Sequence, residues 1–189
     1  MRKIFLVGAL IASFVLIGCQ SAKRTTDVNS NVKGMVYNSV ASNYLPRLTT
    51  VSLSELSDGR EVLFYRVETY NQSHGMPQYE VFAIPFNDVD EHKALLEKFL
   101  EWDNKALSRG DMFTKEIGRA KTYNGYSNYK FHSGNKSSNL LNICFSMTDS
   151  SGCYVEGITF DVNNVKNILQ DIERIKSGKM KHLDDSIYN

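Results

Sequence analysis

The residue types that carry out catalysis are present in the sequence, but they do not stand at catalytic spacings. A zinc protease helix needs two histidines one turn apart, and the four histidines are far from one another: His74, His92, His132 and His182. The Gly-x-Ser-x-Gly turn of serine hydrolases and the glycine-rich loops that bind phosphate are missing. Ser-x-x-Lys occurs three times, but none of these serines begins a strongly patterned helix. We therefore predict no catalytic residue, no metal site and no cofactor, although carboxylates brought together only by folding would leave no sequence pattern.

One predicted hairpin gathers cationic and aromatic side chains on a single face. Asn124-Gly125 is a strong signal for a two-residue type I′ turn, and a turn there places Tyr123 opposite Tyr126. Side chains alternate across a strand, so one face is predicted to carry a candidate binding surface: Arg119, Lys121, Tyr123, Tyr126, Lys130 and His132. The other face carries residues that suit a core: Gly118, Ala120, Tyr129 and Phe131. The first set suits an anionic or sugar-like group, but it equally suits a solvated face whose charges keep the hairpin soluble, which is the commoner use.

The first 19 residues have the parts of an export signal. Arg2 and Lys3 precede an apolar run over residues 4–17, which is shorter than the ~20 residues that a membrane-spanning helix needs. The run ends in Leu-Ile-Gly-Cys at residues 16–19, and these four residues resemble the lipobox of bacterial lipoproteins. The resemblance implies cleavage before Cys19, a diacylglyceryl group on its sulfur, and attachment to a membrane through the acylated cysteine.

The resemblance also implies a location. In lipoproteins of two-membrane bacteria, an aspartate after the acylated cysteine favours retention at the inner membrane, and here that position is Gln20. We therefore expect the outer membrane, with the protein facing the periplasm. A one-membrane bacterium would carry it on the outside of its only membrane.

Export to an oxidising compartment favours a disulfide between the two other cysteines, Cys144 and Cys153. A tight turn at residues 148–149 would make them neighbours across a hairpin, close enough to bond. A turn at residues 150–151 would leave the two sulfurs roughly four residues of strand apart, ~13 Å. The second register packs better, because it pairs two sets of apolar side chains: Ile143 with Ile158, and Leu141 with Phe160. Both registers stay open, and we predict a structural disulfide.

The pattern of apolar residues predicts strands over residues 61–70, 79–86, 113–123, 126–133, 139–148 and 153–160. Apolar residues at helical spacing predict one helix over residues 88–109 and another from Val162, with Asp161 as its cap and Gly178 as its stop. The predicted fold is α+β: an antiparallel sheet of about six strands in ββα-ββββα order, with two helices packed on one face. The predicted parts of the chain are a signal peptide (1–18), a lipidated cysteine with a flexible tether (19–34), a globular domain (35–178) and a loose polar tail (179–189).

The net charge of the mature chain limits the kinds of partner that it can be expected to bind. Removing the signal peptide leaves 20 basic residues against 21 acidic ones, which argues against nucleic acid. We therefore expect a non-enzymatic binding or accessory module for another envelope component, most simply a protein. Two alternatives remain open: an envelope hydrolase with a spatially assembled site, and a lipid-tethered inhibitor or immunity protein that uses residues 71–78 as a protruding loop.

Overall fold

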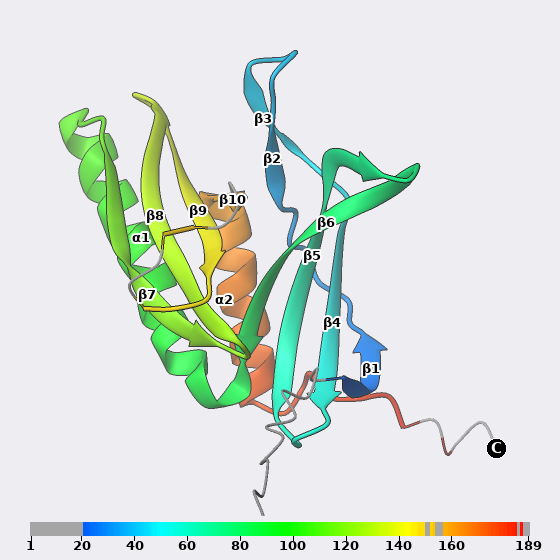
Figure 1. Ribbon diagram of the computed structural model, residues 1–189. Helices are drawn as coiled ribbons and strands as arrows, with labels where there is room; N and C mark the ends of the chain where they lie inside the picture. Colours follow the sequence, from blue (N-terminus) through cyan, green and yellow to red (C-terminus); the bar gives the residue numbers. More distant parts are fainter. Residues whose placement is uncertain (1–20, 150–151, 154–156, 185, 187–189) are drawn as a thin grey trace, which may run out of the picture.

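The computed structural model describes residues 21–149, 152–153, 157–184 and 186, so Cys19 lies outside the described residues. Two antiparallel sheets and two helices make up this part of the chain (Figure 1). The first sheet has the order β1-β4-β5-β6, with bounds Ala22–Asp27, Thr49–Leu56, Glu61–Ser73 and Met76–Pro85. The second has the order β3-β2-β10-β9-β8-β7, with bounds Asn43–Pro46, Met35–Asn38, Ile158–Asp161, Ser138–Ser146, Gly125–Asn135 and Thr114–Thr122. The α+β class is confirmed and the order of strands and helices broadly fits the prediction, but a second sheet exists, because β5 and β6 join β4 and β1 and not the other predicted strands.

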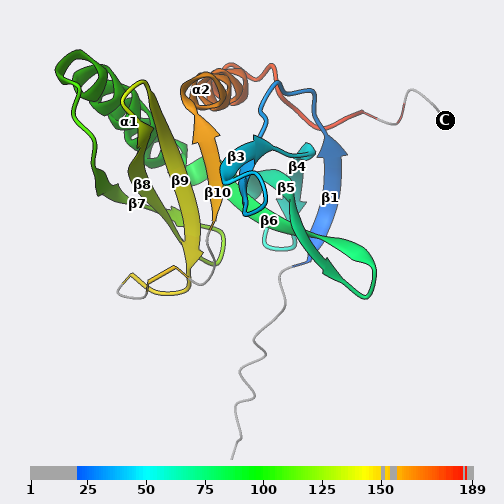
Figure 2. The same ribbon diagram turned by 90° about the horizontal axis from the view of Figure 1, so that it is seen from above.

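Both helices lie where their apolar spacing predicts. Helix α1, Val89–Arg109, ends at Gly110, whose left-handed φ of 70° suits a residue without a side chain. Helix α2, Val162–Lys176, begins at Asp161, where a carboxylate oxygen accepts a hydrogen bond from the Asn164 amide at 2.8 Å. The two helices lie side by side on one face of the six-stranded sheet (Figure 2).

One continuous core joins the two sheets and the two helices. Phe82 of β6 is 2% exposed and stacks on Tyr65 of β5 with ring centroids 5.5 Å apart. On its other sides Phe82 meets Tyr129 of β8 and Phe160 of β10, each with centroids 6.1 Å away. These aromatic contacts fix the four-stranded sheet against the six-stranded one.

The predicted flexible tether is wrong for the described part of residues 19–34. Residues 22–27 form β1 and pair with β4, and Val32 is 1% exposed. An edge strand is held by backbone hydrogen bonds, which need no apolar side chains, so a polar stretch can be ordered. The described start of the predicted loose tail is also packed on the domain, because Met180 is buried and His182 Nδ1 lies 3.1 Å from Thr26 Oγ1 of β1.

The predicted turn at Asn124-Gly125 is displaced by one residue. Thr122 pairs with Gly125, so Tyr123 and Asn124 make the turn, and Gly125 is the first residue of β8. A Cβ atom on Gly125 would stand 2.4 Å from the Ser146 carbonyl oxygen. A glycine is therefore needed at position 125 because β8 and β9 approach each other closely there, and not because the residue lies in a turn.

The turn with two positive φ angles lies elsewhere. His74 and Gly75 have φ of 51° and 76° and connect β5 to β6, with Ser73 opposite Met76. Because this connection takes only two residues, the strands continue through residues 71–78, where a loop was predicted.

The better-packed register of the cysteine hairpin occurs together with the predicted disulfide. Strand β10 pairs with β9 in the better-packed register, with Ile143 opposite Ile158. Cys144 and Cys153 are nevertheless joined by a disulfide, with Cα atoms 5.6 Å apart. Strand β9 ends at Ser146 and β10 begins only at Ile158, so Cys153 lies in the connection and does not follow the strand register.

Candidate functional site

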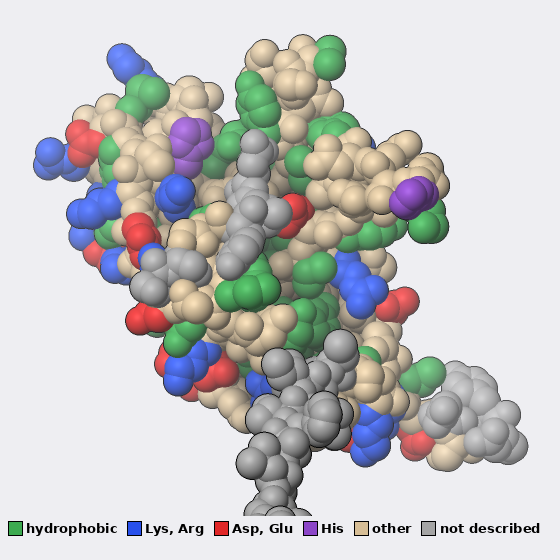
Figure 3. Space-filling view, viewed as in Figure 1, with side chains coloured by type: hydrophobic (Ala, Val, Ile, Leu, Met, Phe, Trp, Pro, Cys, Tyr) green, Lys and Arg blue, Asp and Glu red, His purple; other side chains and the backbone are tan. Residues whose placement is uncertain are grey.

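A groove of about 810 Å³ lies on the face of the six-stranded sheet that the helices leave uncovered. Alternation along β8 separates the two faces: Phe131 packs on Phe99 of α1, with ring centroids 5.6 Å apart, whereas Lys130 and His132 line the groove. Residues of the β2–β3 hairpin and of the β5–β6 hairpin form the walls of this groove. Figure 3 looks onto this face of the molecule.

The first wall of the groove is aromatic. Tyr37 of β2 and Tyr44 of β3 face each other in the strand ladder, and their rings meet edge to face with centroids 5.3 Å apart. The ring of Tyr44 also reaches to 6.4 Å from the ring of His132 on β8. This chain of rings fixes the hairpin against the floor of the groove.

The second wall comes from β5 and β6. The ladder between these strands is irregular between Glu68 and Gln72, and the intervening residues Thr69, Tyr70 and Asn71 line the groove. Arg47 holds this wall: its guanidinium stands 4.4 Å from the centroid of the Tyr70 ring and donates to the Thr69 carbonyl at 3.3 Å. Arg47 directly follows β3, which belongs to the first wall. Its contacts with Tyr70 and Thr69 therefore connect the first wall to the second.

The floor of the groove is mostly neutral and polar. Asn142 of β9 donates from its side-chain amide to the Thr159 hydroxyl of β10 at 3.3 Å. His132 Nδ1 lies 2.9 Å from the Thr114 hydroxyl on β7. With Lys130 as a cation and Glu80 of β6 as an anion, the lining offers hydrogen bonds without a strong net charge.

Exposed apolar side chains gather on the two hairpins and the segments next to them. Of the twelve exposed large hydrophobic residues in the described part of the chain, seven fall there: Tyr37, Val40, Leu48, Tyr70, Met76, Tyr79 and Val81. Two of the seven, Tyr37 and Tyr70, also line the groove itself. Burying exposed apolar side chains against another molecule is favourable.

The predicted binding surface is divided by the structure. Lys130 and His132 lie in the groove, whereas Arg119, Lys121, Tyr123 and Tyr126 do not line it. Arg119 forms an ion pair with Glu116 at 3.1 Å. Tyr123 belongs to the turn and packs its ring on Phe64 of the other sheet, with centroids 5.3 Å apart.

Sequence reasoning missed the three tyrosines of the walls. Tyr37 and Tyr44 bracket a short polar stretch, which is a signal for a hairpin, but Pro46 and the weak pattern around it left residues 35–56 ambiguous. Tyr70 was placed at the end of a predicted strand, with nothing to indicate that β2 and β3 lie near it.

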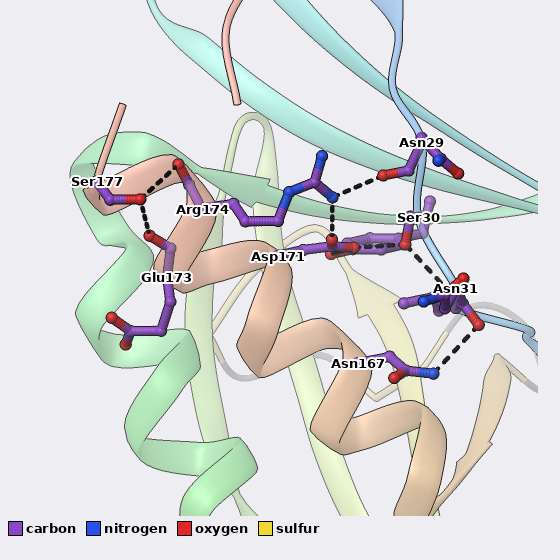
Figure 4. A network of polar contacts seen from close by, with 10 residues as sticks. Asn29, Ser30, Asn31, Asn167, Asp171, Glu173, Arg174 and Ser177 are labelled. Carbon is purple, nitrogen blue, oxygen red and sulfur yellow. Dashed lines mark hydrogen bonds and ion pairs between the residues drawn. The ribbon is translucent and has the colours of Figure 1, made fainter. Parts of the chain in front are cut away.

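The root of the first hairpin is clamped to α2 by a buried carboxylate (Figure 4). Asp171 is 3% exposed and accepts hydrogen bonds from the Ser30 hydroxyl at 2.5 Å, from Arg174 at 3.0 Å and from Tyr65 at 3.3 Å. Burial raises the pKa of Asp171, although the hydrogen bond from Ser30 and the charge of Arg174 act in the opposite direction. We call residues 28–34 the strap, because this network holds them between α2 and the start of β2.

The strap ends next to the groove. The Gly34 amide donates to the Thr49 hydroxyl, and the Gly34 carbonyl accepts from the Arg47 amide, both at 2.9 Å. A Cβ atom on Gly34 would stand 2.3 Å from a Val67 methyl carbon, so the backbone approaches β5 more closely than a side chain would allow. Asp171 thus holds the segment that leads into the β2–β3 hairpin, through its contact with Ser30.

The described groups with the largest pKa shifts lie in the core and not in the groove. Burial lowers the pKa of His92 to about 4, and burial raises the pKa of Tyr129 well above its usual range. The two side chains contact each other, with His92 Nδ1 2.5 Å from the Tyr129 hydroxyl. Shifted groups indicate chemistry where they converge in a cleft, whereas these two form a packed structural pair.

Comparisons with family models, curated proteins and solved structures found no match to this chain. Within the described residues, no group of three histidine, cysteine, aspartate or glutamate side chains could hold a metal ion. In the same part of the chain, no helix has the length and apolar character to cross a membrane.

Proposed function

We propose that this protein is a lipid-anchored module of the bacterial envelope that binds a segment of another envelope protein in the groove. The observation that carries the proposal is the concentration of exposed tyrosine, methionine and aliphatic side chains on the two hairpins beside the groove. Tyrosine offers a large rigid ring and a hydroxyl at little entropic cost, so it is enriched where proteins bind proteins.

The chemistry of the lining supports a polypeptide as the ligand. Backbone amides of a bound segment would find side-chain partners of both kinds, because Asn71 and Asn142 line the groove and an amide side chain can both donate and accept. Lys130 and Glu80 carry opposite charges, so the groove gives no preference to a strongly anionic ligand. The near-neutral chain likewise does not favour nucleic acid.

A tethered inhibitor or immunity protein is a second candidate, and the β5–β6 hairpin favours it. Strand β4 pairs with β5 only as far as Val67, so the end of this hairpin projects beyond the sheet (Figure 1). Met76, beside its turn, is 67% exposed. An inhibitor would use the tip at His74-Gly75, whereas a binding module would use the groove.

The groove is tested by crosslinking in cells from single positions of matched exposure. A photoreactive amino acid replaces Tyr37 or Tyr70 in the groove walls, or Leu107 on α1; these residues are 43%, 40% and 42% exposed. We expect the two groove positions to capture the same envelope protein and position 107 to capture none. Capture from a probe at position 74 alone would favour the inhibitor.

Binding should depend on the same rings. Tyr37→Ala is expected to weaken binding of the captured partner by about 10- to 100-fold, since an aromatic anchor in an interface contributes about 1–3 kcal/mol. Leu107→Ala, at equal exposure, should leave the affinity unchanged. Equal affinities for both variants in a titration with the purified partner would contradict the proposed site.

The anchor makes a separate prediction. Cys19→Ala removes the sulfur that would carry the lipid, so we expect no incorporation of a labelled fatty acid and an uncut precursor. The measurement is metabolic labelling followed by electrophoresis of the immunoprecipitated protein. Incorporation into the Cys19→Ala variant would exclude Cys19 as the lipidated residue.

A further inference from the structure

The described part of the chain begins at Ser21, two residues after the proposed anchor. The Ser21 carbonyl accepts a hydrogen bond from the Ser57 amide at 2.9 Å, and Ala22 pairs with Leu56 in the first sheet. Cys19 is two residues before Ser21, so the covalent chain allows no more than about 7 Å between their Cα atoms. A lipid on Cys19 would therefore hold the turn at residues 57–60 close to the membrane surface.

The groove lies at the other end of the molecule. Strand β5 leaves this turn at Glu61 and reaches the groove wall at Tyr70, nine residues further on. At about 3.3 Å per residue, the two ends of that stretch are roughly 30 Å apart. Figure 1 shows the two at opposite ends of the molecule, with the start of β1 at the lower end and the β2–β3 hairpin at the upper end.

We infer that the anchored protein stands on the end formed by the 57–60 turn and the start of β1, and presents the groove on the aqueous side, roughly 30 Å from the lipid surface. The inference rests on the proposed lipid anchor. It specifies the partner further: the bound segment belongs to a protein, or to a part of one, that lies in the aqueous compartment beyond the lipid headgroups.

This orientation comes from the short connection between Cys19 and Ser21, and not from attraction between basic side chains and the membrane surface. Three basic side chains at this end contact acids: Lys23 and Arg24 contact Glu55 at 2.8 and 3.4 Å, and Arg60 contacts Asp58 at 2.8 Å. Paired charges offer anionic headgroups little net attraction. The orientation should therefore persist at ionic strengths that screen surface charges.

Energy transfer to the membrane surface tests the orientation. The lipidated protein carries Ser57→Cys at the anchored end or Val40→Cys in the β2–β3 hairpin, and both positions are exposed. With Cys19 acylated and Cys144 bonded to Cys153, the introduced cysteine is the one that takes the dye. In phosphatidylcholine vesicles with an acceptor on the headgroups, we expect strong transfer from position 57 and weak transfer from position 40, in low and in high salt.

A spacer variant is the matched control. Sixteen Gly and Ser residues inserted between Gln20 and Ser21 have a mean span of about 22 Å. The domain should then tumble, and the transfer efficiencies from positions 57 and 40 should approach each other.

Three outcomes would overturn the inference. Equal transfer from both positions without the spacer would exclude a fixed orientation. A difference that disappears in high salt, or that survives the spacer, would show adsorption in place of a short tether. Failure of the protein to associate with vesicles would remove the anchor and the inference with it, whereas failure of the groove crosslinks would count against the proposed ligand site alone.

Discussion

Replacing Asp171 by alanine is expected to lower the free energy of unfolding by about 3–5 kcal/mol, the cost of breaking a buried hydrogen-bonded charge network. The carboxylate is 3% exposed and accepts from three side chains that lie on different parts of the fold: Ser30, Tyr65 and Arg174. Alanine would leave these donors without an acceptor and would open a cavity between α2 and the strap. Urea unfolding of the purified domain at neutral pH measures the loss.

Glu173→Ala on the same helix is the matched control. Glu173 forms an ion pair with Lys93 at 2.6 Å, but the pair is exposed to solvent, so its removal should leave the unfolding midpoint nearly unchanged. Amide hydrogen exchange distinguishes loss of the Asp171 network from destabilisation of the whole domain. In the Asp171 variant, the amides of Val32 and Lys33, which bond to Ser30 Oγ and Asn164 Oδ1, should exchange with solvent faster than those of α1. Equal stability of the two variants would show that the network contributes nothing.

The helices were predictable because their signals are local. A helix shows its apolar stripe within one stretch of sequence, and its ends are set by residues such as Asp161 and Gly110 that act through their own backbone neighbours. Both helices therefore lie within one or two residues of the predicted bounds. The strands of β5 to β10 were found for the same reason, from alternation and apolar runs.

The division into two sheets was not predictable, because it depends on which strands pair with which, and β1 at the edge of the four-stranded sheet carries little apolar pattern. Strand β1 has no buried residue and is held through its ladder with β4. Nothing in the sequence of residues 22–27 shows where those backbone groups find partners. The hairpin register failed for a related reason: Gly125 has two uses, a turn or a close approach, and only the position of Ser146 decides between them.

The groove could be predicted only in part. Lys130 and His132 were identified because alternation within one hairpin places them together. The tyrosines that face them come from β2, β3 and β5, which are far away in sequence and belong to elements whose arrangement depends on the strap. A site built from three separate segments has no local spacing that a sequence could show.

The histidine in the core should make the protein sensitive to acid. His92 is fully buried between α1 and the β7–β8 hairpin, where Nε2 lies 2.7 Å from the Lys121 carbonyl oxygen and Nδ1 lies 2.5 Å from the Tyr129 hydroxyl. A carbonyl oxygen can only accept, so Nε2 carries the hydrogen and the neutral ring accepts from Tyr129 at Nδ1. Protonating Nδ1 would force the Tyr129 hydroxyl to find another acceptor inside the core.

Stability should therefore fall as the pH falls, with a range set by the two pKa values of His92. The pKa is about 4 in the folded protein and 6.5 for an ordinary histidine, so between these values the unfolded chain binds the proton more readily than the folded one. The stabilisation is complete above about pH 6.5 and is lost toward pH 4, by roughly 3 kcal/mol in all.

His92→Gln tests this origin of the acid sensitivity, because glutamine does not titrate. We expect the variant to be less stable than the wild type by about 1–3 kcal/mol at pH 7, since one hydrogen bond of the buried pair is lost. Its stability should then decline less on acidification, so the two curves of unfolding free energy against pH converge toward pH 4. His132→Gln in the groove is the control and should keep the wild-type slope. A constant difference between wild type and His92→Gln from pH 7 to pH 4.5, measured by urea unfolding, would show that His92 is not the group responsible.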